Sequence, residues 1–207
     1  MKFTKRHVMA AAASLTLLGA GSVIAQAAMT KVPSEVQAGT YKLDSSHGNI
    51  TWSVNHLGFS QYYGQFANAT AELKLDSANP SASTLTATIP MGDVATTSAG
   101  LTRHLKNADF FDVENHPTAT FTSRSLRVDA SDPTKATVEG DLTLRGVTKP
   151  VTMEVKFNQA GPSMGGTYKA GFDGRAMIKR SDFGITYGLP AIGDDVKLHI
   201  EGEFVRQ

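Results

Sequence analysis

Residues 138–157 alternate between apolar and polar side chains with a period of two on both sides of a short turn. Successive side chains of a β-strand point to opposite faces, so this period predicts two strands, each with one apolar and one polar face. The turn between them, residues 145–150, contains a glycine and a proline, and the proline cannot donate to a ladder. The sequence therefore predicts an antiparallel hairpin whose apolar faces need a partner surface or a ligand.

The same period of two recurs along the rest of the chain. It predicts further strands near residues 41–43, 50–56, 67–75, 83–89, 118–128, 168–179 and 196–205. About eight principal strands at short spacing, without an internal repeat, favour an all-β fold with one antiparallel barrel over a β-sandwich. Inward alanines such as Ala69, Ala71 and Ala87 would leave room inside such a barrel.

One short helix is predicted over residues 98–108. Ser98 can cap its amino end, and Leu101 and Leu105 fall on one face. The adjacent Phe110 and Phe111 follow directly, so this segment could cap one end of the barrel. Residues 57–64 break the alternation with two glycines and three aromatic residues, and we interpret them as an apolar loop of the kind found at a mouth or a contact surface.

The first 27 residues have the features of a secretory signal peptide. A basic start precedes an uncharged apolar run, and Ala25-Gln26-Ala27 offers the small residues that a signal peptidase needs. We expect cleavage after Ala27, a flexible tail over residues 28–39 and one barrel domain over residues 40–207. The apolar run is shorter than the roughly 20 residues of a membrane span, so we expect no membrane-spanning segment.

Composition argues against several classes of function. Removal of residues 1–27 deletes three basic residues and no acidic one, which changes the net charge from +1 to about −2, so we expect no nucleic-acid partner. The chain has no cysteine, which excludes disulfides, thiolate metal sites and a cysteine nucleophile. The histidines lack metal-site spacing, and no nucleophile elbow or phosphate loop is present. We therefore expect no enzyme activity, no cofactor and no metal.

Two rival hypotheses stay open. A lipid hydrolase or isomerase on the same barrel predicts that Asp182, His56 and His104 lie within hydrogen-bonding distance of one another. A turn-forming aspartate, or a buried pair with Arg180, also explains Asp182. The second rival is a structural or stress-linked module whose barrel is closed by its own side chains, which predicts no sizeable cavity.

Five separated motifs resemble the signature blocks of the YceI-like family. In chain order they are Asn55-His56-Leu57-Gly58, Leu105-Lys106-Asn107-Ala108-Asp109-Phe110-Phe111-Asp112, His116-Pro117-x-Ala119-x-Phe121, EGDLTLRGVTKPV over residues 139–151, and Arg180-Ser181-Asp182-Phe183-Gly184-Ile185. The resemblance extends over residues 40–206. It implies a lipocalin-like barrel, exported to the periplasm, that encloses a long isoprenoid or another amphipathic lipid.

We therefore expect a single antiparallel eight-stranded lipocalin-like barrel that carries a lipid and performs no reaction of its own. The expected ligand is a long-chain isoprenoid, an isoprenoid quinone or a fatty-acid-like lipid, and a homodimer is a possible assembly. The loop 57–64 and the helix 98–108 would gate the interior. The residues expected to contact the lipid are Trp52, Val54, His56, Phe59, Ala69, Ala71, Ala87, Leu101, Leu105, Phe110, Phe111, Phe121, Leu142, Leu144, Met153, Val155 and Phe183.

Overall fold

A computed structural model describes residues 28–207, so the expected signal peptide, residues 1–27, lies outside the described residues. Within the described part, no helix combines the length and the hydrophobicity that crossing a bilayer requires. The elements in chain order are η1 (Pro33–Glu35), β1 (Gly39–Leu43), β2 (Asn49–His56), β3 (Ser60–Phe66), β4 (Thr70–Leu75), η2 (Pro80–Ala82), β5 (Thr84–Pro90), η3 (Met91–Asp93), β6 (Val94–Ala95), α1 (Ala99–Leu105), β7 (Thr118–Val128), β8 (Lys135–Leu144), β9 (Val147–Pro162), β10 (Tyr168–Lys179), η4 (Arg180–Phe183) and β11 (Ile192–Arg206).

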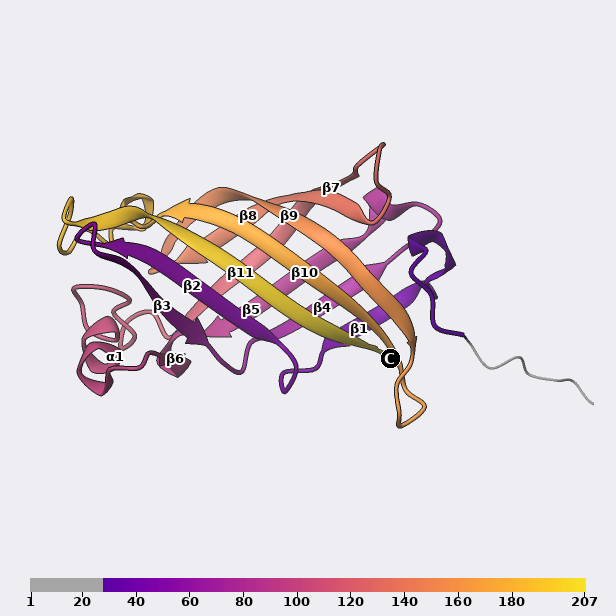
Figure 1. Ribbon diagram of the computed structural model, residues 1–207, viewed down its shortest axis with the longest axis horizontal. Helices are drawn as coiled ribbons and strands as arrows, with labels where there is room; N and C mark the ends of the chain where they lie inside the picture. The colour runs from indigo at the N-terminus through magenta and orange to yellow at the C-terminus, as the bar shows by residue number, and fades with distance from the viewer. Residues whose placement is uncertain (1–27) are drawn as a thin grey trace, which may run out of the picture.

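Eight strands form a closed antiparallel barrel in the order β1-β4-β5-β7-β8-β9-β10-β11, and the pairing of β1 with β11 closes the ring. β11 is long enough to pair twice along one edge, with β2 over most of its length and with β1 near its end. The strands β2, β3 and β6 extend the wall on this edge. Figure 1 shows an elongated barrel with α1 beside β6 at one end and β1 toward the other. The expected eight-stranded antiparallel barrel with one α-helix is confirmed.

The hairpin that the alternation predicted is formed by β8 and β9, but its turn is shorter than expected. Only Arg145 and Gly146 separate the two strands, both with positive φ (51° and 73°), a conformation that matches the twist of a hairpin. Pro150, expected in the turn, lies within β9. β10 pairs with β9 only from Met153 onward, so one edge of β9 is free at Pro150. A proline is tolerated there, because no neighbouring strand needs its N–H as a hydrogen-bond donor.

The apolar loop expected over residues 57–64 is instead a tight turn followed by strand β3, and the prediction of a gating loop here was wrong. Leu57 and Gly58 turn the chain with positive φ (57° and 74°), and β3 then pairs with β2 along its whole length. The inward positions of β3 are Tyr62, Gly64 and Phe66. The glycine interrupts the apolar alternation on which the prediction depended, so the strand was not recognised.

Residues 28–39, expected as a flexible tail, lie against the barrel in the structure. Thr30 forms a β-bridge with Ala160 of β9, through N–H···O bonds of 2.7 and 2.9 Å. Val36 is buried in an apolar cluster that also contains Tyr41 and Phe204. One buried apolar side chain and one bridge therefore hold a segment whose polar composition suggested a tail.

Two apolar clusters occupy the two ends of the barrel. One contains Trp52 together with Leu105 of α1 and Phe110. The other, toward β1, contains Tyr41 and Phe204. The space between the two clusters is where a ligand site can lie.

Tyr41 makes the stability of the second cluster sensitive to alkaline pH. Its side chain is fully buried and its hydroxyl donates to the carbonyl oxygen of Gln37. Burial raises the pKa of Tyr41 from 10.0 to about 12, with Tyr168 adding to the rise and Arg206 opposing it. Because the unfolded chain has the ordinary pKa, the stabilisation is complete below pH 10 and is lost as the pH rises toward 12.

We expect the midpoint of thermal unfolding, followed by circular dichroism, to fall across this pH window more steeply in the wild type than in Tyr41→Phe. The phenylalanine variant keeps the buried ring but has no proton to lose, so it serves as the matched control. Parallel pH profiles of the two proteins would show that Tyr41 does not control the alkaline transition.

Candidate functional site

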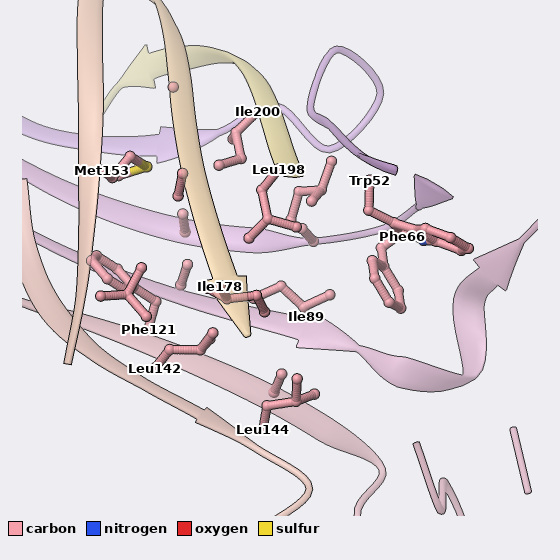
Figure 2. Close-up of a pocket in the computed structure, with 18 of the residues that line it drawn as sticks. Trp52, Phe66, Ile89, Phe121, Leu142, Leu144, Met153, Ile178, Leu198 and Ile200 are labelled. Atoms are coloured by element: carbon pink, nitrogen blue, oxygen red, sulfur yellow. The ribbon is translucent and has the colours of Figure 1, made fainter. Parts of the chain in front are cut away.

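An apolar cavity of about 430 Å³ lies inside the barrel. Every strand of the closed ring, from β1 to β11, contributes inward side chains to its wall. Figure 2 shows side chains from facing strands directed into a common space, among them Phe121, Leu142, Ile178 and Leu198. The volume is within the range of about 300–1,000 Å³ that is typical of small-molecule sites.

Many apolar side chains that point into the barrel are only half-buried. Val54, Phe121, Leu142, Val155 and Leu198 all line the cavity and all keep part of their surface accessible. Side chains in a close-packed core would leave no such surface. The interior is therefore under-filled by the protein's own residues.

The cavity is long rather than round. On β11, the lining positions run on alternate residues from Val196 to Phe204. At about 3.3 Å per residue and a strand tilt of about 40°, this stretch corresponds to about 20 Å along the barrel axis. Such a shape suits an extended chain better than a compact solute.

Small residues on the inner wall account for the space. Ala71 of β4 pairs with Ala87 of β5, and Ala87 pairs in turn with Phe121 of β7. The ring of Phe121 lies over Gly140 of β8, where an added Cβ would be 2.4 Å from Phe121 Cζ and 2.6 Å from the carbonyl oxygen of Thr122. Gly140 therefore allows Phe121 to form part of the cavity wall.

Gly140→Ala is expected to lower the free energy of unfolding by about 1–3 kcal/mol, because the new Cβ meets a backbone oxygen that cannot move without the sheet. Gly165→Ala is the matched control, since no atom lies within 4 Å of an added Cβ there. We expect that control to change the stability by less than about 0.5 kcal/mol. Denaturant unfolding measures both, and equal effects would show that the close approach at Gly140 is not limiting.

Trp52, the one tryptophan of the chain, lies in the cavity wall. Its ring covers Gly64 of β3, where an added Cβ would be 2.2 Å from Trp52 Cζ2. Among the buried side-chain nitrogen and oxygen atoms of residues 28–207, the indole Nε1 stands alone in having no hydrogen-bond partner. Because no second tryptophan contributes, the fluorescence of Trp52 can report what occupies the cavity.

α1 and the segment after it cover one end of the cavity. Ser98 caps the helix by accepting a hydrogen bond of 3.3 Å from the N–H of Leu101, as the sequence predicted. Leu101, Leu105 and Phe110 all line the cavity. The helix predicted over residues 98–108 is therefore present, with its regular part limited to Ala99–Leu105.

Arg145, in the turn between β8 and β9, connects this cover to the barrel. Its guanidinium donates to the carbonyl oxygen of Ala108, after α1, at 2.6 Å, and to that of Gly184, after η4. Hydrogen bonds from a charged donor are stronger than neutral ones. One side chain thus holds together the hairpin, the helical segment and the loop before β11.

Arg180 is buried, with 5% of its surface exposed, and holds the loop that precedes β11. Burial lowers its pKa below the ordinary 12.5, and the charge of Asp194 opposes the shift. Arg180 is among the residues that line the cavity, and its guanidinium is engaged by the backbone. It donates four hydrogen bonds of 2.8–3.1 Å, to the carbonyl oxygens of Ile185, Tyr187, Ile192 and Gly193.

The buried pair between Arg180 and Asp182 that the sequence suggested is not formed, because Asp182 is exposed. Asp194 provides the nearby carboxylate instead. It accepts hydrogen bonds from the N–H of Ser181 at 2.8 Å and from the hydroxyl of Ser181 at 2.7 Å. These bonds lower the pKa of Asp194 against the opposing effect of burial.

The cluster that the enzyme hypothesis requires is absent from residues 28–207. His104 Nε2 lies 2.8 Å from Asp109 Oδ2, and the ring of His56 is close to that of Tyr62. No hydrogen bond among these residues joins Asp182, His56 and His104. The geometry therefore gives no support to a catalytic role for this set.

All but two of the residues expected to contact a lipid line the cavity. The lining set is Trp52, Val54, His56, Ala69, Ala71, Ala87, Leu101, Leu105, Phe110, Phe111, Phe121, Leu142, Leu144, Met153 and Val155. Phe59 differs because the tight turn directs it outward, where 89% of its surface is exposed. Phe183 differs because it is buried in the cluster beside α1, 1% exposed, without reaching the cavity.

The sequence reasoning missed the lining residues of the last two strands. Ala176, Ile178, Leu198 and Ile200 all line the cavity. They follow the same period of two as the residues that were chosen, so the signal was present. Strands were predicted over residues 168–179 and 196–205, but none of their residues was assigned to the lipid.

Two surface groups bring a histidine close to carboxylates. Lys169 Nζ lies 2.9 Å from Asp44 and 2.8 Å from Glu203, so a cation of the protein already contacts both carboxylates of the first group. His199 Nε2 lies 3.0 Å from each of its two carboxylate partners in the second. The groups are Asp44, His47 and Glu203, and Asp173, His199 and Glu201. The carboxylates of both groups thus already have partners within the protein.

Comparison with known proteins agrees with this architecture. Residues 41–204 match the family model described as the YceI-like domain. The chain is 36% identical over 178 residues to a UPF0312 protein of Ectopseudomonas mendocina, an alignment that covers 85% of this chain and 92% of that protein. The crystal structure of BcnA from Burkholderia cenocepacia superposes with a TM-score of 0.70 at 24% identity, covering 78% of this chain and 98% of BcnA.

A structure from Saccharophagus degradans, described as a polyisoprenoid binding domain implicated in plant cell wall breakdown, has the same fold. Its TM-score is 0.60 at 13% identity, and the match covers 83% of this chain and all of that one. The family model and the curated relative together cover most of the described chain. The chain belongs to the family of YceI-like domains.

Proposed function

We propose that this protein is a periplasmic carrier that encloses a long-chain isoprenoid, or a similar amphipathic lipid, in its barrel. The observation that carries the proposal is the under-filled apolar cavity of about 430 Å³. The S. degradans protein is described as binding polyisoprenoid, and at 13% identity that likeness concerns the fold. The argument for this chain therefore rests on its own cavity.

Burial of hydrocarbon can supply the affinity without strong polar contacts. Each buried methylene contributes about 0.8 kcal/mol, so a chain of about twenty carbons contributes about 16 kcal/mol, against an association cost of about 4–15 kcal/mol. Met153 and Met91 line the cavity, and methionine adapts to irregular apolar shapes. A flexible hydrocarbon would thus complete the core that the protein leaves under-filled.

The charges in the cavity wall favour an uncharged enclosed group. Within the described residues, the charged side chains that line the cavity are Arg180 and Glu201, apart from His56. Arg180 is engaged by four backbone carbonyl oxygens. An enclosed phosphate or carboxylate would lack a counter-ion, which burial penalises strongly. We propose that the enclosed part is an isoprenoid chain or a neutral ring such as a quinone, and that a charged head group would remain in water.

The periplasmic location is part of the proposal and rests on the sequence of residues 1–27. The basic start, the apolar run and the small residues before the expected cleavage after Ala27 support export. The proposed carrier needs no cofactor, since the lipid is its ligand and undergoes no reaction.

The two rivals fit the structure less well. A module with a closed core predicted no sizeable cavity, and the observed cavity contradicts that expectation. A lipid-modifying enzyme predicted a cluster of Asp182, His56 and His104, which the described residues do not form. Binding is the function that the geometry supports best.

The test is native purification from the periplasm, organic extraction and mass spectrometry of the extract. We expect a lipid with a long hydrocarbon chain in near-stoichiometric amount. The delipidated protein should then take up a prenyl alcohol in a saturable titration that changes the fluorescence of Trp52. A delipidated protein that binds no prenyl chain would overturn the proposal.

A further inference from the structure

Three large apolar side chains are exposed at the end of the barrel where α1 lies. Leu57 and Phe59, in the turn between β2 and β3, have 49% and 89% of their surface exposed. Tyr187, in the loop before β11, is 49% exposed. We name these three residues the tip patch. Exposed apolar groups that gather in one place mark an interaction surface more often than scattered ones do.

The two segments that carry the tip patch are adjacent. The N–H of Leu57 donates to the carbonyl oxygen of Ala191 at 3.0 Å, which joins the β2–β3 turn to the loop before β11. Figure 1 shows both segments at the extreme end of the barrel, beyond the last paired residues of the sheet. The patch is thus formed by protruding turns rather than by a groove.

Neither segment carries a charge. Residues 45–71 and 183–193 contain no aspartate, glutamate, lysine or arginine, although these four types make up 19% of the chain. A protein surface that is removed from water on binding must not contain unpaired charges, because their desolvation costs far more than apolar burial contributes. Both protruding turns meet this condition.

The tip patch is also continuous with the cover of the cavity. The ring of Tyr187 lies 4.9 Å from that of His104 in α1 and 5.3 Å from that of Phe110. Phe110 lines the cavity. Tyr187 therefore contacts, on one side, the side chains that separate the patch from the lipid site.

We infer that the tip patch docks on the surface of a lipid bilayer, with Leu57 and Phe59 entering the interface and Tyr187 at the headgroup level. The inference rests on the proposed function, since a carrier of membrane lipid has to meet the membrane at the end where its cavity is covered. Protruding apolar turns suit a deformable bilayer, whereas a protein partner would require a matching pocket. Tyrosine, with an apolar ring and a polar hydroxyl, is favoured at membrane interfaces.

The experiment measures co-flotation of the processed chain with vesicles of phosphatidylethanolamine and phosphatidylglycerol. We expect the wild type to bind reversibly, and the double variant Leu57→Ser/Phe59→Ser to bind at least about tenfold more weakly, since burying one phenylalanine accounts for a factor of this size. Phe59→Trp should retain binding, because tryptophan is also favoured at the interface. Met164→Ser is the matched control, a fully exposed apolar residue in the turn between β9 and β10.

Two outcomes would overturn the inference: no binding of the wild type to vesicles, or equal binding by the double-serine variant. Bound lipid is measured on the same proteins by mass spectrometry, which tests the proposed function independently of vesicle binding. Vesicle binding without any bound lipid would instead overturn the proposed function and leave the docking surface in place. Thermal unfolding of each variant verifies the fold.

Discussion

Arg180→Leu is expected to lower the free energy of unfolding by about 4 kcal/mol, because it leaves several backbone carbonyl oxygens without a donor at a buried site. The guanidinium donates to four carbonyl oxygens between Ile185 and Gly193, and it is 5% exposed. Leucine fills part of the volume and replaces none of these hydrogen bonds. Denaturant unfolding followed by circular dichroism measures the loss.

Two variants serve as controls for this prediction. Arg180→Lys keeps the charge but cannot reproduce the planar fork, so we expect an intermediate loss of stability. Arg175→Leu removes an exposed arginine of β10, the strand that precedes η4. Its ion pair with Asp173 is 3.3 Å long, and its loss should cost less than about 1 kcal/mol. If Arg180→Leu proved as mild as Arg175→Leu, the carbonyl oxygens would have to be satisfied in another way, and the account of Arg180 would fail.

Ala87→Phe should reduce the affinity for a prenyl chain by about 100-fold or more, since the ring displaces several enclosed carbons at about 0.8 kcal/mol each. Ala87 lines the cavity between Ala71 and Phe121, its neighbours on β4 and β7. The midpoint of thermal unfolding should stay the same or rise, because the ring fills space that the native core leaves open. Titration followed by Trp52 fluorescence measures the affinity, and mass spectrometry of the purified variant measures bound lipid.

Thr86→Phe is the matched control for Ala87→Phe. It adds the same side chain one residue earlier on β5, at an exposed outward position. We expect it to bind lipid like the wild type. Ala87→Leu adds less volume and should give a smaller loss, so a graded series separates occupancy of the cavity from misfolding. Unchanged lipid binding by Ala87→Phe would place the lipid elsewhere.

The strands of the barrel could be predicted where the alternation was uninterrupted. The hairpin of β8 and β9 and the inward residues Trp52 and Val54 of β2 followed from a period of two. β3 could not be predicted in this way, because Gly64 occupies an inward position where Trp52 covers it. The alternation of β3 is completed by a side chain from another strand, which local sequence does not show.

The sequence could predict which side chains point into the candidate site, but not the volume of that site. Ala71 and Ala87 could be assigned to the inner face, as could Leu142 and Leu144. Phe59 could not be placed outside, because its position depends on the tight turn at Leu57 and Gly58. The four hydrogen bonds of Arg180 were also beyond prediction. Two acceptors, Ile185 and Tyr187, lie in the loop before β11, and the other two are in the first residues of β11, so the folding of this loop decides which carbonyl oxygens meet the guanidinium.

The sequence by itself determined which face of each regular strand is apolar, because the direction of a side chain depends only on the local backbone period. The tertiary structure alone decided that the sheet closes, since the pairing of Tyr41 with Arg206 joins the two ends of the described chain. It also decided how much space remains inside. That volume depends on which inward side chains meet across the barrel, as Phe121 meets Gly140 and Ala87, and distances between strands are set only when the ring is closed.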